Sequence, residues 1–232
     1  MQKKPPLKPR PQRVRPALTH QIRIIGGQWK RTPLPVLDAN GLRPTPDRVR
    51  ETVFNWLSHL RDGRWEGVAC LDLFAGTGAL GFEAASRGAA KVLMVEENTA
   101  AARQLEATRV KLKAGQIEVV RGNALTVTQS LIARSGEGQF DLIFLDPPYL
   151  QEWLPKMLPL CRRLLAAGGV LYVEAEAALV PPLPPQRKDR AGLDDAPAAD
   201  WMAGWEVVRA DRAGMVFYHL LQCGMGPEVK SG

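Results

Sequence analysis

The segment VACLDLFAGTGALGFEAASRG constrains the fold most, because it predicts a buried strand, a glycine-rich turn and an amphipathic helix in direct succession. Asp72 closes the strand region. Gly76 and Gly78 let the backbone pass close to a ligand at the N-terminus of the helix, where unpaired N–H groups lie. The letters GTGALG also match the dinucleotide fingerprint G-x-G-x-x-G, so this segment alone is compatible with a nicotinamide-dependent oxidoreductase.

Further strand patterns alternate with helical ones after this unit. We expect strands at residues 91–95, 117–120, 142–145 and 170–173, helices at about 98–113, 125–133 and 153–165, and a closing strand pair at 205–210 and 215–221. Gly168 and Gly169 are expected to end the last helix, and the proline-rich residues 181–199 predict a long loop. This alternation favours an open, doubly wound α/β sheet, in which ligands bind beyond the carboxyl ends of the strands.

If the strand that ends at Asp72 is counted as the first, polar side chains follow the second strand (residues 91–95) and the third strand (residues 117–120). Glu96 stands at the end of the second strand, where a carboxylate can accept both hydroxyls of a ribose. Nicotinamide cofactors and S-adenosylmethionine both contain a ribose, so Glu96 does not separate them. Asn123 follows the third strand and could bind an adenine edge, although an Asn after a Gly more often belongs to a plain turn.

The segment FDLIFLDPPY predicts a strand that ends in a carboxylate and stops at two prolines. Pro147 and Pro148 cannot donate to a sheet ladder, so Asp146 and the Pro147 carbonyl should project beyond the strand end. Tyr149 adds an aromatic face. Together these groups suit a planar base with an exocyclic amino group, which needs acceptors for its N–H groups and a ring to stack on. A proline-stopped strand followed by a turn is the alternative.

Positive charge is concentrated at the N-terminus. The net charge is +7, and residues 1–20 hold six basic residues and no acid, which leaves 25 basic against 24 acidic residues in the rest of the chain. The proline-rich residues 1–20 are expected to be a weakly structured tail that attracts a polyanion through phosphate contacts. A tail that serves only solubility is the alternative.

Two segments between this tail and the glycine turn carry more cations. QIRIIGGQWKRTPLPV predicts a hairpin around Gly26 and Gly27, which is either a nucleic-acid contact surface or a structural ribbon. LRPTPDRVRETVFNWL predicts a helix with Thr45 as its cap and Pro46 at its first position. The expected apolar face of this helix consists of Val49, Val53, Trp56, Leu57 and Leu60, and the remaining face carries Arg48, Arg50 and Glu51.

Composition excludes several other classes. Hydrophobic residues make up 45% of the chain, but no window approaches the ~20 apolar residues of a membrane span, and no signal peptide is visible, so we expect a cytoplasmic protein. Cys70, Cys161 and Cys223 are far apart and not near a histidine pair, which argues against disulfides and zinc. We expect reduced thiols and no bound metal, with a monomer as the default oligomeric state.

The order of DLFAGTGALG and DPPY resembles that in class I S-adenosylmethionine-dependent methyltransferases that modify an exocyclic amino nitrogen. With IRIIGGQWK and LRPTPDRVRETVFNWL before them, residues 21–221 are similar to the bacterial RsmD family, which methylates guanine N2 in 16S ribosomal RNA. The resemblance implies a Rossmann-like, mostly parallel seven-stranded sheet with an antiparallel last strand, plus an N-terminal β-hairpin extension. It also implies an RNA-contacting extension at 21–64 and a catalytic domain at 65–222, between the tail at 1–20 and a C-terminal tail at 223–232.

The resemblance also implies roles for single residues, with S-adenosylmethionine as the cofactor. Cofactor contacts are expected from Asp72, Phe74, Ala75, Gly76, Thr77, Gly78, Glu96, Asn123, Ala124 and Asp146. Asp146, Pro147, Pro148 and Tyr149 are expected to receive the flipped guanine. Expected RNA contacts are Arg23, Lys30, Arg31, Arg43, Arg48 and Arg50, and the expected partner is 16S ribosomal RNA within a partly or fully assembled small subunit.

Two further alternatives stay open on the sequence. DPPY also occurs in methyltransferases that act on adenine N6 in DNA, and the hairpin and the LRPT helix favour ribosomal RNA over that reaction. A non-catalytic RNA-binding or assembly protein that retains the fold is the other alternative, against which the intact set of expected site residues argues.

Overall fold

A seven-stranded sheet forms the centre of the computed structural model, which describes residues 22–36, 46–149, 151–179 and 200–224. The strands are β3 (Ala69–Asp72), β4 (Lys91–Glu96), β5 (Ile117–Arg121), β6 (Phe140–Leu145), β7 (Leu165–Ala175), β8 (Trp205–Ala213) and β9 (Val216–Cys223). Their order is β5-β4-β3-β6-β7-β9-β8. All neighbours from β5 to β7 are parallel, and β9 is antiparallel to β7 and β8, which confirms the predicted sheet.

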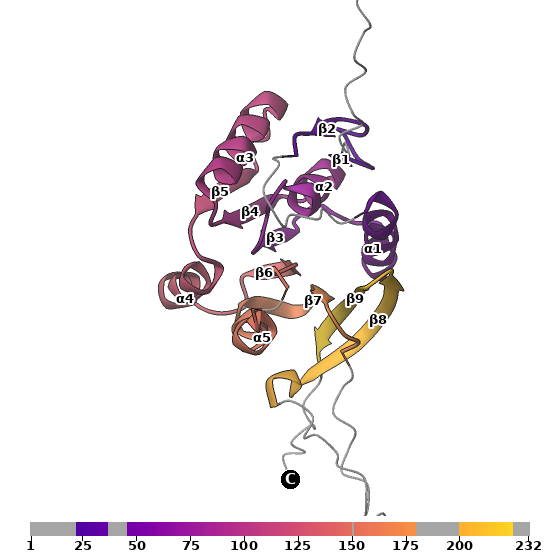
Figure 1. Ribbon diagram of the computed structural model, residues 1–232, viewed down its shortest axis with the longest axis vertical. Coiled ribbons are helices and arrows are strands. Elements are labelled where there is room, and N and C mark those ends of the chain that lie inside the picture. The colour runs from indigo at the N-terminus through magenta and orange to yellow at the C-terminus, as the bar shows by residue number, and fades with distance from the viewer. Residues whose placement is uncertain (1–21, 37–45, 150, 180–199, 225–232) are drawn as a thin grey trace, which may run out of the picture.

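Helices cover both faces of this sheet (Figure 1). They are α1 (Asp47–Leu60), α2 (Ala79–Arg87), α3 (Thr99–Leu112), α4 (Ala124–Ser135) and α5 (Trp153–Leu164), and a short 3-10 helix spans Asp200–Met202. Side chains alternate along each strand, so Phe144 packs into the core beneath α1 and α2 while Ile143 packs into the core beneath α4 and α5. The two cores explain why the strands are apolar on both faces.

The N-terminal hairpin docks on α2. Its strands β1 (Ile22–Arg23) and β2 (Pro33–Leu34) pair antiparallel and lie beside α2 in Figure 1. The buried Glu83 carboxylate accepts hydrogen bonds from the N–H groups of Ile25 (2.6 Å) and Gly26 (2.8 Å). A Cβ at Gly27, where φ is +72°, would overlap the Ser86 carbonyl, so this close approach requires glycine.

Several element boundaries differ from the predictions. Helix α1 begins at Asp47 with Pro46 before it, and Thr45 lies outside the described residues. Gly168 and Gly169 do not end α5, because they lie inside β7, where its register with β6 shifts between Phe140 and Leu142. Strand β8 extends three residues further toward the turn than expected, whereas β9 begins one residue later and ends two residues later than expected. Residues 1–20 and the predicted loop at 181–199 lie outside the described residues, and the domain boundaries stay predictions.

Candidate active site and nucleic-acid interface

The glycine turn and the DPPY turn lie at the point where the strand order reverses. Strand β3 has β4 on one side and β6 on the other, so the chain winds in opposite directions from it. Asp72 is the register partner of Phe144, and the N–H of Leu73 donates to the Phe144 carbonyl at 3.1 Å. Asp146 therefore follows two residues beyond the level of Asp72 on the adjacent strand, and both turns border one edge of the sheet.

Backbone contacts hold the glycine turn against β4. The N–H of Ala75 donates to the Val95 carbonyl at 3.0 Å, and the N–H of Gly76 donates to Glu96 Oε2 at 2.8 Å. Gly76 and Gly78 have φ values of +51° and +77°. Gly78 precedes α2 without a side-chain cap, so the first turn of α2 points its backbone donors toward the turn that carries Phe74 to Gly78.

Asp72 lies beneath this turn and is only 2% exposed. Its Oδ2 accepts a hydrogen bond from the N–H of Gly81 at 3.0 Å. Burial raises the pKa of Asp72 to about 7, and the nearby charge of Glu96 also raises it. A cation placed near the turn would favour the ionised form of Asp72, which matches the ammonium group of an amino-acid ligand.

Glu96 ties the ends of two strands together and still has acceptor capacity. Its Oε1 accepts from the N–H of Asn98 at 2.7 Å, in addition to the Gly76 contact at Oε2. A carboxylate offers about four acceptor sites, so this half-buried group can also accept hydroxyl donors. The chemistry of this edge therefore fits a ribose.

Asn123 acts as the N-cap of α4. Its Oδ1 accepts from the N–H groups of Leu125 (3.0 Å) and Thr126 (3.4 Å), and its Nδ2 lies 3.4 Å from the Glu97 carboxylate. This is the turn chemistry that the preceding glycine indicated. Contact of Asn123 and Ala124 with an adenine stays a prediction, and Glu97 is a neighbour that the sequence did not single out.

The DPPY turn presents a ring at the sheet edge that both turns border, which we call the candidate catalytic edge. Tyr149 is 43% exposed, Asp146 is half-buried, Pro147 is buried and Pro148 is exposed. At the start of α5, Trp153 meets Phe74 edge to face at 5.2 Å between ring centroids, which joins the two turns. Trp153 was not among the predicted site residues, although an aromatic residue four positions after Tyr149 was a usable signal.

A second carboxylate lies beside Asp146. Leu145 pairs with Val173, so Glu174 on β7 stands level with Asp146 on β6. The Tyr172 hydroxyl donates to Glu174 Oε1 at 2.7 Å, and burial, followed by the charges of Glu174 and Asp146, raises the pKa of Tyr172. Glu174 was also missed, although it directly follows a predicted strand, as Glu96 does.

Three of the expected RNA contacts gather at one hollow. Arg23, Lys30 and Arg31 line a surface depression of about 330 Å³ between the hairpin and the start of α1, with Ile24, Ile25, Asp47 and Glu51. Arg23 pairs with Asp47 at 3.2 Å, while Lys30 and Arg31 are exposed. Arg48 is exposed on α1, and Arg43 lies outside the described residues.

Arg50 differs from the expectation that it lies on the exposed face of α1. Its side chain is fully buried and donates to Asp47 Oδ1 at 2.6 Å and to the Arg23 carbonyl at 3.0 Å. Burial lowers its pKa, and Asp47 opposes that effect. In this structure Arg50 joins α1 to the hairpin and is not accessible to a polyanion, because the hairpin covers the face that the helix alone would leave open.

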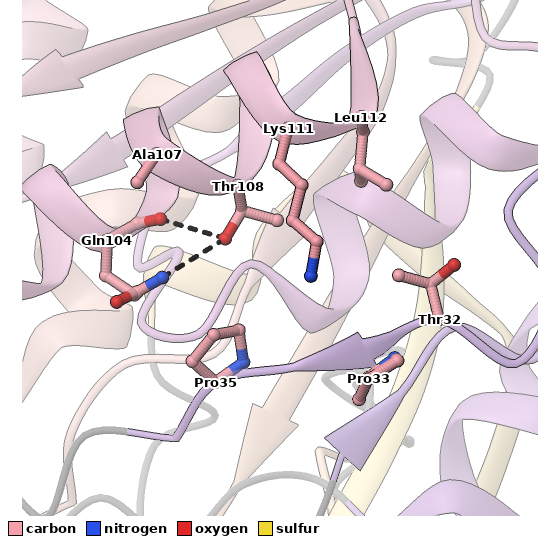
Figure 2. Close-up of a pocket in the computed structure, with 8 residues that line it drawn as sticks. All are labelled: Thr32, Pro33, Pro35, Gln104, Ala107, Thr108, Lys111 and Leu112. Atoms are coloured by element: carbon pink, nitrogen blue, oxygen red, sulfur yellow. Dashed lines mark hydrogen bonds between the residues drawn. The ribbon is translucent and has the colours of Figure 1, made fainter.

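Another hollow, of about 220 Å³, lies between β2 and α3. Figure 2 shows Lys111 extending from α3 toward β2, beside Thr108. The Thr108 hydroxyl donates a hydrogen bond to the Gln104 carbonyl. Neither hollow coincides with the edge that carries Asp72 and Asp146, so the catalytic assignment rests on strand register. Within the described part of the chain, no group of three or more potential ligand side chains is placed to hold a metal, and no helix could cross a membrane.

The strand order, the glycine turn after the first sheet strand and the acidic turn after the fourth define a class I S-adenosylmethionine-dependent methyltransferase fold. Solved structures agree with this class. A protein described as a candidate methyltransferase from Escherichia coli superposes with a TM-score of 0.66 at 36% identity, covering 88% of this chain and 98% of that one. A hypothetical protein from Thermus thermophilus gives 0.65 at 27% identity, with 86% and 98% covered.

Sequence comparisons identify the family. The family model described as Conserved hypothetical protein 95 matches residues 22–188. Ribosomal RNA small subunit methyltransferase D of Escherichia coli K12 is 41% identical over 204 residues, which cover 87% of this chain and 90% of that protein. The protein of the same name from Haemophilus influenzae is 34% identical, with 87% and 94% covered. The chain therefore belongs to this family, the RsmD family.

Proposed function

We propose that this protein transfers a methyl group from S-adenosylmethionine to the exocyclic N2 of a guanine in 16S ribosomal RNA, within a partly or fully assembled small subunit in the cytoplasm. The observation that carries the proposal is the register that places the glycine turn after Asp72 beside Asp146 at the switch point of the sheet. The names of the relatives support ribosomal RNA as the substrate.

The residues of the glycine turn fit the cofactor. Asp72 beneath the turn suits a cationic amino group, the Glu96 carboxylate suits a ribose, and Gly76 and Gly78 allow a close backbone approach. Asn123 and Ala124 border the expected adenine position. When bound, the sulfonium of the cofactor supplies the methyl group.

Residues of the DPPY turn would orient the base. Asp146 and the Pro147 carbonyl accept hydrogen bonds from the guanine N2 hydrogens, so that the lone pair on this weakly nucleophilic nitrogen faces the methyl group. Tyr149 offers its exposed ring for stacking. Catalysis comes mainly from positioning, and Asp146 need not be a strong base, because the proton becomes acidic once N2 carries the methyl group.

The first test replaces the acceptor. Asp146→Ala should lower methyl transfer to small ribosomal subunits by about 100-fold or more, whereas calorimetry should show that S-adenosylmethionine binding survives largely intact, because the other expected cofactor contacts remain. The matched control is Glu118→Ala, because Glu118 is an exposed acid on β5. Wild-type transfer rates in the Asp146 variant would refute the assignment of this residue.

Two rival activities can be distinguished from the proposed one by measuring which cofactor the protein binds and which nucleic acid it methylates. The nicotinamide oxidoreductase explains GTGALG but gives no role to DPPY, and titration with NADH against S-adenosylmethionine tests it directly. The DNA adenine methyltransferase is tested by offering labelled S-adenosylmethionine with duplex DNA or with small subunits. We expect binding of S-adenosylmethionine alone and label in RNA alone.

A further inference from the structure

The turn between β8 and β9 extends beyond the candidate catalytic edge of the sheet. Leu145 pairs with Val173, and Val173 pairs with His219, so Asp146, Glu174 and Tyr218 stand at one level on β6, β7 and β9. Two strand spacings separate Asp146 from Tyr218, which is about 10 Å. Residues 211–217 form what we call the β8–β9 tip, and Met215 precedes Tyr218 by three positions, about 10 Å further beyond the edge.

Contacts with α1 hold the β8–β9 tip in place, and Figure 1 shows this turn beside α1. The Tyr218 ring stacks on Trp56 at 5.5 Å between centroids, and its hydroxyl donates to Asp211 Oδ2 at 2.8 Å. Within the tip, Arg212 Nε donates to the Gly214 carbonyl at 2.6 Å. The tip therefore presents its side chains from a fixed position, which lowers the entropic cost of binding a partner.

The chemistry of the tip suits a nucleic acid. Met215 is 78% exposed, and the exposed Arg212 guanidinium lies over the Phe217 ring at 5.3 Å. Arg48 of α1 is exposed nearby, where its charge lowers the pKa of Asp211 after the larger contributions of the Arg212 N–H and the Tyr218 hydroxyl. Arginine binds phosphates and stacks on bases, and methionine is one of the apolar side chains that wedge between bases.

We propose that the β8–β9 tip is a second RNA-contact element, in which Arg212 binds a phosphate near the target nucleotide and Met215 packs against the neighbouring base. This inference rests on the proposed function and extends it. A flipped base leaves its stack while its neighbours stay outside the site, within reach of a tip whose Met215 lies, from these two spacings, roughly 14 Å from Asp146. Met215 fills the space that the base has left, which stabilises the flipped arrangement.

The test of Met215 uses small ribosomal subunits from cells that lack the gene, with labelled S-adenosylmethionine. Met215→Ala should lower kcat by about 10-fold, because stabilisation of the flipped base is lost. Met215→Leu should retain wild-type turnover. Val110→Ala is the matched control, because Val110 is 63% exposed on α3. Calorimetric S-adenosylmethionine affinity should be equal in all variants, which excludes a folding defect as the cause.

The test of Arg212 measures affinity for naked 16S ribosomal RNA across salt concentrations. Arg212→Ala should weaken binding and reduce the slope of log K against log salt by roughly 0.7 to 0.9, the value for one phosphate contact. Arg134→Ala is the control, because Arg134 is exposed on α4, away from the candidate catalytic edge. An Arg212 effect seen only with assembled subunits would overturn the proposal in favour of a protein contact.

The outcomes separate this inference from the proposed function. If wild-type protein methylates subunits and both tip variants match their controls, the tip proposal is refuted and the proposed function stands. If wild-type protein transfers no methyl group to RNA, the proposed function fails, and the tip proposal fails with it.

Discussion

Three acidic side chains of this protein differ in their burial and in the groups that surround their carboxylates. Glu83 is buried, accepts two hairpin N–H groups and pairs with Arg87 Nε at 2.7 Å, so its charge is compensated within the fold. Asp72 is buried near another carboxylate, Glu96, and its pKa is raised to about 7. Asp146 is half-buried at the candidate catalytic edge. We infer that Glu83 serves stability, whereas Asp72 and Asp146 serve ligands at some expense of stability.

Asp72→Asn tests this difference through pH. The folded-state pKa of about 7 lies above the ordinary value of 3.8, so the folded state holds this proton while the unfolded state releases it. The stability that Asp72 contributes in its protonated form is therefore lost as pH rises from the unfolded to the folded pKa. Relative to wild type, the variant should gain roughly 2 kcal/mol of unfolding free energy between about pH 5 and about pH 8.

Urea unfolding of both proteins at the two pH values provides the measurement. The same variant should bind S-adenosylmethionine more weakly, because the neutral amide cannot pair with a cation. A stability difference that does not change with pH would show that Asp72 does not hold a proton in the folded protein.

At the scale of elements, the stability of the N-terminal hairpin depends on the surface of α2 against which it docks. Its strands are only two residues long, and a hairpin of that size is not stable alone. The contacts to Glu83 and Ser86 on α2 hold it in place. Helix α2 also begins at the glycine turn, so the proposed RNA-contacting surface and the proposed cofactor turn are joined by one helix.

Gly27→Ala should detach the hairpin. The alanine must adopt a φ of +72° and its Cβ overlaps the Ser86 carbonyl, so the loss should exceed the ~1–2 kcal/mol of left-handed strain alone. Gly63→Ala is the control, because Gly63 has a φ of +75° and open space around its Cβ position. Urea unfolding should show a clearly larger loss for Gly27→Ala, and equal losses for the two variants would contradict tight docking.

Across the whole molecule, local patterns predicted the fold well, because strand and helix periods and turn residues are set by nearby sequence. The same logic placed Asp72, Glu96 and Asp146 at strand ends that meet at one edge. The burial of Arg50 was not predictable, since its partner is the Arg23 carbonyl of the hairpin. The position of Glu174 beside Asp146 depends on pairing between β6 and β7, which no local pattern specifies.

The charge distribution of the molecule accords with a polyanionic substrate. Basic side chains line the hollow between the hairpin and α1, and Arg212 stands at the β8–β9 tip beyond the candidate catalytic edge. These two surfaces lie on elements that contact α1, so a structured RNA could reach both while one base meets the sheet edge that carries the two turns. Binding to such a substrate should weaken steeply as salt concentration rises.

Mapping of methylated guanines in 16S ribosomal RNA tests the central claim most directly. RNA from cells with and without the gene would be compared. Cells that lack the gene would also be complemented with a gene for either the wild-type protein or the Asp146→Ala variant. We predict that one N2-methylguanine disappears without the gene, returns with the wild-type protein and does not return with the variant. An unchanged methylation map in cells that lack the gene would contradict the account.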